Sequence, residues 1–108
     1  MPEGHVYILG SETGTLYTGV TSDFDKRLWE HRNGIKSTFA TKYGCKRVLL
    51  HEEFTDIRSA ISREKEIKGW TRAKKLALIA QTNPEFKDLC PQHHWQMLPP
   101  QQAIADQK

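Results

Sequence analysis

The sequence predicts a small α/β domain of the α+β type, in which two strands, a helix, a third strand and two more helices follow one another (order β-β-α-β-α-α). Two observations predict this order. Short segments rich in β-branched and aromatic residues are followed by segments that begin at a helix-capping residue and end at a glycine or proline. The 108 residues suffice for one domain and are too few for two of ordinary size.

The first two strands are predicted at residues 5–9 and 15–20. Both segments are β-branched and aromatic, and a short polar loop connects them. Because the connection is short, the strands are expected to pair as an antiparallel hairpin. Tyr7 and Tyr17 can then point to the same face of the hairpin, in a register that the sequence does not fix.

The first helix is expected to begin at the capping sequence Ser22-Asp23-Phe24-Asp25 and to run to about residue 33. Gly34 is its expected left-handed stop. A basic loop is predicted over residues 35–46, followed by the third strand over residues 47–54.

The last two helices are predicted after this strand. Asp56 caps a helix over residues 57–68, and Thr71 caps one that runs to about residue 82 and ends at Asn83-Pro84. Residues 1–89 are therefore assigned to the domain, and residues 90–108 to a polar tail rich in Pro and Gln, disordered or loosely docked. A metal cluster of Cys90, His93 and His94 is the alternative interpretation of that tail.

Charge is concentrated in two basic clusters. Residues 26–47 contain seven Lys and Arg against one acid, and a second basic cluster covers residues 63–75. Such clusters suit a polyanion, because Lys and Arg displace the counterions condensed on phosphates. Solubilising faces are the alternative. The longest apolar run, at residues 76–80, is too short for a bilayer, so no membrane association is expected.

The two cysteines, Cys45 and Cys90, lie far apart and form no C-x-x-C pair. Neither a disulfide framework nor a zinc knuckle is therefore expected. Reduced thiols and a cytoplasmic location are the expected interpretation.

Three polar residues lie on helix faces that also carry apolar anchors. Arg27 and His31 share the anchoring face of the first helix. Glu64 lies between Ala60 and Ile67 in the apolar stripe of the second helix, where a carboxylate loses solvation and needs a cation, several donors or a metal. A structural salt bridge, with Arg27 as its partner across the core, and a functional site both remain open.

Two tripeptides and the residues that follow them resemble a known family. His5-Val6-Tyr7 and Tyr17-Thr18-Gly19 resemble the paired motif that names the GIY-YIG nucleases, with His and Val replacing Gly and Ile in the first and Thr replacing Ile in the second. Arg27, His31, Glu64 and Asn83 follow in the family's order. Residues 5–89 resemble the small stand-alone branch of this family, which is related to the nuclease domain of an excinuclease.

The resemblance implies a three-stranded antiparallel sheet flanked by helices, with the site on one face. It also implies a metal-dependent endonuclease that hydrolyses nucleic-acid phosphodiesters with Mg²⁺ or Mn²⁺ and needs no small-molecule cofactor. By this resemblance Glu64 would be the metal ligand, and Tyr7 and Tyr17 would position and deprotonate the attacking water, with Tyr7 as the base. Arg27 would neutralise charge on the phosphate, and His31 would relay a proton. Asn83 would lie near the site, and Gly19 would have a structural role.

The basic loop offers mainly phosphate contacts, from Lys36, Lys42, Lys46 and Arg47. Weak sequence preference is therefore expected. The resemblance implies DNA as substrate in preference to RNA, and a role in DNA repair or processing beside larger repair machinery. Two alternatives come from other classes. One is a non-catalytic nucleic-acid-binding module that keeps the fold, and the other is a protein-interaction adaptor.

Overall fold

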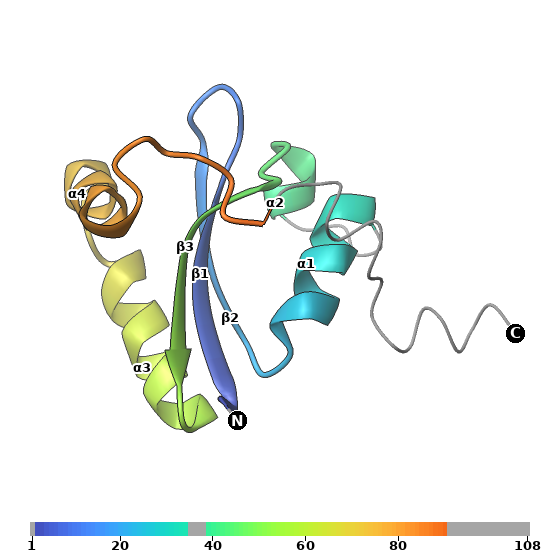
Figure 1. The fold of residues 1–108 in the computed structure, drawn as a ribbon, viewed down its shortest axis with the longest axis vertical. Helices are drawn as coiled ribbons and strands as arrows, with labels where there is room; N and C mark the ends of the chain where they lie inside the picture. Colours follow the sequence, from blue (N-terminus) through green and yellow to red (C-terminus); the bar gives the residue numbers. More distant parts are fainter. Residues whose placement is uncertain (1, 35–38, 91–108) are drawn as a thin grey trace, which may run out of the picture.

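The computed structural model describes residues 2–34 and 39–90, in which helices lie on both faces of a three-stranded antiparallel sheet (Figure 1). The elements in chain order are β1 (Gly4–Gly10), β2 (Leu16–Thr21), α1 (Phe24–Asn33), α2 (Phe39–Lys42), β3 (Arg47–Phe54), α3 (Ile57–Lys68) and α4 (Arg72–Thr82). The predicted fold class is confirmed. Within the described ranges no helix is long and apolar enough to cross a membrane.

The sheet has the strand order β2-β1-β3, so β1 is its central strand. In the β1–β2 register Tyr7 pairs with Gly19, and Leu9 pairs with Tyr17. Because directly opposed residues point to the same side of a sheet, Tyr7 and Tyr17 share a face, as predicted.

The two faces of the sheet carry separate cores. Val6 and Ile8 pack with Ala60 and Ile67 on the face covered by α3 and α4. Tyr7 and Leu9 point the other way and pack with side chains of α1 and α2, among them Leu28. Figure 1 shows α1 and α2 on the side of the sheet opposite to α3 and α4. The alternation of β1 therefore places the motif tyrosine on the α1 side.

The helices begin and end where local signals place them. The Asp23 carboxylate accepts a hydrogen bond from the Lys26 N–H at the start of α1, and Gly34 ends the helix in the left-handed conformation, with φ 63°. The side chains of Asp56 and Thr71 cap α3 and α4 in the same way.

The prediction of a loop over the whole of residues 35–46 is wrong in one segment. Residues 39–42 form the short helix α2, which packs beside α1. A single helical turn has too few residues for the periodicity that reveals a helix. This turn carries Phe39 over the ring of Tyr17, with 6.2 Å between the ring centroids.

A β-bulge interrupts the pairing of β1 with β3. Ile8 pairs with Leu50 and Leu9 pairs with Val48, so Leu49 has no partner in the register. Leu49 and Leu50, although adjacent, both belong to the core on the α3 side. The extra residue thus changes which side of the sheet the rest of β3 faces.

Candidate active site

Tyr7 is the centre of the candidate site. Its side chain is 1% exposed, and its hydroxyl lies 3.0 Å from Nε2 of His31 on α1. The ring lies directly over Gly19 of β2, where an added Cβ would come within 2.5 Å of the ring carbon Cζ. The absence of a side chain at Gly19 leaves room for the tyrosine hydroxyl, and the structural role of this glycine stays a prediction.

Burial sets the protonation of this pair. Burial raises the pKa of Tyr7 above its ordinary value, whereas it lowers the pKa of His31 to about 4, with a further contribution from the Arg27 charge. Both groups are therefore neutral at pH 7. In that state the direction of the hydrogen bond follows the imidazole tautomer: with the proton on Nδ1, the Tyr7 hydroxyl donates to Nε2 of His31.

The lowered pKa of His31 has a consequence for stability. The unfolded chain binds this proton at pH values near 6.5 and below, whereas the folded protein resists it down to about 4, so the free energy of unfolding falls as the pH drops through this window. Between pH 7 and pH 5 the loss from His31 alone is about 2 kcal/mol. Urea unfolding of the parent and of His31→Gln at both pH values measures this loss.

Since the pKa of His51 is lowered as well, the parent carries a second contribution of the same sign. When the pH-dependent loss measured for His31→Gln is subtracted from that of the parent, the contribution of His51 cancels, because His51 is present in both proteins. Equal pH dependence in the two proteins would contradict a neutral His31 in the folded state.

Tyr17 lies next to the same pair. Its ring centroid is 5.4 Å from that of His31, in an edge contact, and 6.3 Å from that of Tyr7. Tyr17 is only half-buried, so it offers solvent the second hydroxyl of the cluster.

Arg27 supplies the cation of the cluster. Its guanidinium lies close enough to lower the pKa of both Tyr7 and His31. The nearest carboxylate contact that it makes is a long one, with 3.6 Å between Nη1 and Oε1 of Glu30. Its Nε is buried and has no hydrogen-bond partner among the described residues. The Arg27 side chain is nevertheless 32% exposed, and a partly exposed guanidinium suits a phosphate oxygen.

Glu64 lies on α3, which covers the face of the sheet opposite to that of Tyr7. Its side chain faces the sheet, it is 7% exposed as a residue, and its charge raises the pKa of the Tyr7 hydroxyl. Its ion-pair partner is Lys68, one helical turn on, with 2.6 Å between Nζ and Oε2. The alternative of a structural salt bridge to Arg27 is not observed, because Arg27 pairs with Glu30 instead.

Glu64 and Thr18 offer oxygen ligands of the kind that a magnesium or manganese ion takes, both on the α3 side of the sheet. The hydroxyl of Thr18 is buried without a partner in the described part of the chain, and its pairing with Ile8 directs it to the α3 side, as Glu64 is directed. A carboxylate and a hydroxyl are hard oxygen ligands, and Mg²⁺ takes few protein ligands and keeps several waters. Glu64 would be the protein ligand of such an ion.

Asn83 lies outside this cluster. Its side-chain amide donates to the carbonyl groups of Leu49 and Lys87, and its Oδ1 accepts from the Lys87 N–H. Asn83 thus ends α4 and holds the following turn against β3. These backbone groups occupy its amide, and its predicted place near the site stays a prediction.

The predicted phosphate contacts divide into three groups. Lys36 lies outside the described residues. Lys42 and Lys46 are exposed, and the Lys42 ammonium lies 5.5 Å from the centre of the Tyr43 ring. Arg47 is tied to the β1–β2 loop, because its Nη2 donates to the carbonyl of Ser11 at 2.9 Å.

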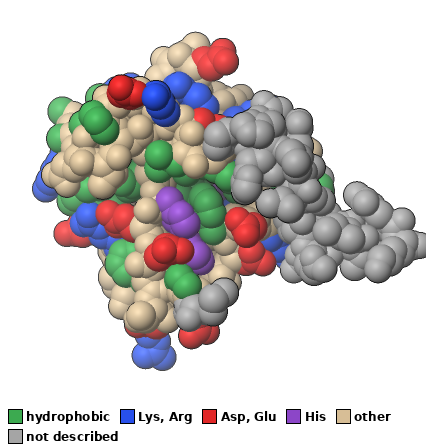
Figure 2. Space-filling view, in the orientation of Figure 1, with side chains coloured by type: hydrophobic (Ala, Val, Ile, Leu, Met, Phe, Trp, Pro, Cys, Tyr) green, Lys and Arg blue, Asp and Glu red, His purple; other side chains and the backbone are tan. Residues whose placement is uncertain are grey.

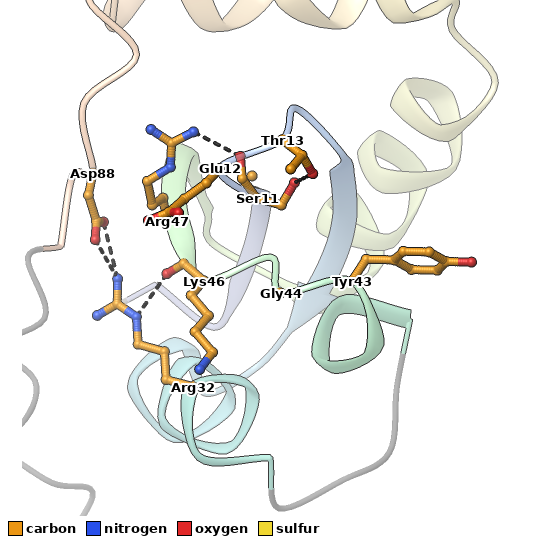
Figure 3. A pocket seen from close by; sticks show the side chains of 10 residues that line it. Ser11, Glu12, Thr13, Arg32, Tyr43, Gly44, Lys46, Arg47 and Asp88 are labelled. Carbon is orange, nitrogen blue, oxygen red and sulfur yellow. Dashed lines mark hydrogen bonds and ion pairs between the residues drawn. The ribbon is translucent and has the colours of Figure 1, made fainter.

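Lys46 and Arg47 line a pocket of about 450 Å³ at the β1–β2 loop (Figure 3). Arg32 forms one wall and is held by two hydrogen bonds to Asp88 and by one to the carbonyl of Lys46. Neither motif tyrosine lines this pocket, so it is separate from the cluster around Tyr7.

Two exposed aromatic side chains beside the cluster were not predicted as site residues. Phe39 and Tyr43 are 50% and 47% exposed and lie 4.6 Å apart between ring centroids, and Phe39 stacks on Tyr17. Aromatic residues within a basic loop are the sequence signal that could have identified them. Together with Lys42 they form a surface with both aromatic and cationic groups, here called the aromatic surface.

The family model of the GIY-YIG catalytic domain matches residues 3–77 of the chain. The chain belongs to this nuclease family, whose substrates are nucleic acids and whose members are typically metal-dependent. Within it, the chain is similar to small stand-alone proteins named UPF0213. The relative in Syntrophus aciditrophicus is 44% identical over 86 residues, which cover 79% of this chain and 98% of that protein.

Other relatives carry the same name. A UPF0213 protein of Staphylococcus saprophyticus is 39% identical, covering 75% of this chain and 99% of its own length. Among solved structures, the solution NMR structure of the UPF0213 protein BH0048 from Bacillus halodurans is similar with a TM-score of 0.53 and 29% identity, over 79% of this chain and 90% of that one.

Proposed function

We propose that this protein is a metal-dependent endonuclease that hydrolyses phosphodiesters of nucleic acid, DNA in preference to RNA. The observation that carries the proposal is the buried contact of Tyr7 on β1 with His31 on α1, beside the charge of Arg27. Tyr7 contacts His31 directly, and the charges of Arg27 and Glu64 both act on its pKa. A base, a proton acceptor, a cation and a carboxylate are the groups that phosphodiester hydrolysis requires.

In the proposed reaction Tyr7 and His31 move the proton of the attacking water. The water proton passes to the oxygen of Tyr7 while the Tyr7 proton passes along the existing hydrogen bond to Nε2 of His31. This coupled transfer avoids a free phenolate, which the raised pKa of Tyr7 disfavours. Tyr17, half-exposed beside the pair, orients the water.

Arg27 and Glu64 supply the charges that the phosphate needs. The guanidinium of Arg27 neutralises the negative charge that grows on the phosphoryl oxygens as the water attacks. A divalent cation held by Glu64 would polarise the phosphate and stabilise the leaving oxygen.

The aromatic surface favours a substrate with unstacked bases. Phe39 and Tyr43 offer ring faces to solvent beside Tyr17, and base–aromatic stacking is sequence-tolerant because every base has a π-face. Lys42 and Lys46 would add phosphate contacts that carry no sequence information. We therefore expect weak sequence preference and recognition of branched or flapped DNA, as in DNA repair or processing.

The test is a substrate panel. Purified protein is incubated with plain, flapped and branched DNA, and with matched RNA, in the presence of Mg²⁺, Mn²⁺ or EDTA. Metal-dependent cleavage, fastest on substrates with unpaired segments, is the expected result. Binding without cleavage of any substrate would contradict the proposal.

A non-catalytic nucleic-acid-binding module is the second candidate. The observation that favours it is the burial of Tyr7, whose side chain is 1% exposed. The substrate panel separates the two candidates, because the module would bind with the same dependence on salt and leave every substrate intact.

Gly19→Ala should disable the site through geometry. The added Cβ would overlap the Tyr7 oxygen, and the buried ring has no free space to retreat into. We expect cleavage to fall about a hundredfold or more, since small misplacements of reacting groups have effects of that size. Overpacking should lower the free energy of unfolding by about 1–3 kcal/mol.

Cleavage assays and urea unfolding measure these two effects. Tyr7→Phe is the matched control, because it removes the hydroxyl and leaves the ring, so it should lose cleavage with little loss of stability. A Gly19→Ala protein that cleaves at the parent rate would show that the position of the hydroxyl is unimportant.

Replacing both Lys42 and Lys46 by Gln should weaken binding to all sequences alike. For each phosphate interaction that the substitutions remove, the slope of log affinity against log salt should fall by about one. Fluorescence anisotropy over a salt series measures the slope. Lys65→Gln, an exposed charge on α3, is the control. An unchanged slope in the double variant would place the binding surface elsewhere.

A further inference from the structure

Two histidines and a glutamate meet at the end of the sheet near the N-terminus. His5 lies on β1 and pairs in register with Glu53 of β3, and His51 lies two residues before Glu53 on the same strand. One ligand atom from each of the three side chains lies within 4.8 Å of the others. The closest approach, between Nδ1 of His5 and Nε2 of His51, is 2.9 Å.

These three residues are open to a cation from solvent. His5 and His51 are half-buried and Glu53 is exposed. They line a pocket of about 340 Å³ together with Asp23 and Asp25 at the start of α1. Figure 2 shows histidine side chains at the surface with acidic side chains beside them. Two imidazoles among several carboxylates give a surface that attracts positive ions.

The separation of the two ring nitrogens fits shared coordination. Ligand atoms about 2.0–2.2 Å from a common zinc ion lie about 3.0–3.5 Å from one another. The two nitrogens are near this distance already. The exposed Glu53 carboxylate can close the remaining gap by a change of rotamer.

The donor set of the cluster also suits a metal. Two imidazole nitrogens with one carboxylate are typical ligands of zinc and similar transition metals, whereas Mg²⁺ prefers an all-oxygen set.

We propose that His5, His51 and Glu53 bind a divalent transition-metal ion of the zinc type, at a site separate from the magnesium or manganese ion proposed at Glu64. The three ligands leave further coordination positions to water. The bound ion would join β1 to β3 and fix the imidazole of His51.

Fixing His51 has an effect on α1. The ring of Phe24, the first residue of α1, stacks on His51 with 4.0 Å between the ring centroids and an angle of 12° between the ring planes. Phe24 also contacts the Tyr7 ring at 5.7 Å. The ion would therefore hold the start of α1 against the sheet, and we expect its binding to raise the melting temperature.

The test is a Zn²⁺ titration of the full chain after chelator treatment, followed by calorimetry and by the melting temperature. One equivalent per chain and a higher melting temperature are expected. Glu53→Gln, at an exposed position that tolerates substitution, and His51→Gln should each weaken binding about tenfold or more. Undiminished binding in Glu53→Gln and His51→Gln would overturn the proposal.

Controls distinguish this site from other ligands in the chain. His93→Ala/His94→Ala removes the histidines outside the described residues, and Glu64→Gln removes the other proposed ligand. Both proteins should bind Zn²⁺ as the parent does. Loss of binding in either control protein would assign the ion to another site and overturn the proposal. A titration with Mg²⁺ alone should leave the melting temperature of Glu64→Gln unchanged.

Discussion

Glu64→Gln is expected to abolish metal-dependent cleavage and to leave the metal-free protein at least as stable as the parent. The amide keeps the shape of the side chain and removes the charge that would hold the cation. The carboxylate is 7% exposed, so its replacement relieves a desolvation cost. Its partner Lys68 has a half-exposed side chain, so no buried cation is left unpaired.

If Glu64 instead had a structural role, Glu64→Gln would lose a large and measurable amount of stability. If Glu64 belonged to a buried structural pair, its loss would cost about 3–5 kcal/mol. Each kcal/mol moves the melting temperature of a domain of this size by about 4–8 °C. A strongly destabilised Glu64→Gln that still cleaves would therefore defeat the assignment of Glu64 as metal ligand.

A cleavage assay with Mg²⁺ or Mn²⁺ and a melting curve in EDTA measure both effects. Glu66→Gln is the matched control on the same helix. Glu66 is exposed and paired with Arg63, so its replacement should leave cleavage near the parent level.

Arg27→Ala should reduce cleavage about a thousandfold while affinity for nucleic acid changes little. One cation among many contributes modestly to affinity, whereas this one lies where charge develops in the reaction. Its partly exposed side chain and its long contact to Glu30 leave the guanidinium available for a phosphate. Single-turnover cleavage and anisotropy binding on the same substrate separate the two effects.

Lys26→Ala is the control, because it removes a neighbouring, partly exposed cation outside the cluster. It should keep cleavage near the parent level. A large loss of affinity in Arg27→Ala, with cleavage in proportion to occupancy, would show that Arg27 only anchors the phosphate backbone.

Structural features that depend on residues close together in the sequence could be predicted from it. The bounds of α1, α3 and α4 agree with the predictions because Asp23, Asp56 and Thr71 cap these helices through residues three positions on. The order of strands and helices follows from the same local signals. Helix α2 was missed because a single turn shows no periodicity.

Features that depend on distant residues could not be predicted in the same way. The sequence indicated Arg27 as the structural partner for Glu64, whereas the pair forms with Lys68 at the favoured four-residue spacing. The approach of Tyr7 to Gly19 needed the strand register, and the pairing of His5 with His51 joins residues 46 positions apart. No spacing rule connects such positions.

The bulge at Leu49 makes the length of β3 as important as its composition. Val48 and His51 lie three positions apart, yet both pair with α1-side residues of β1, Leu9 and Tyr7. In a strand without the extra residue, positions three apart point to opposite sides. A deletion at Leu49 would therefore turn the imidazole of His51 toward the apolar core under α3, or turn Val48 away from the core on the α1 side. A substitution at Leu49 should consequently be tolerated far better than a deletion or an insertion.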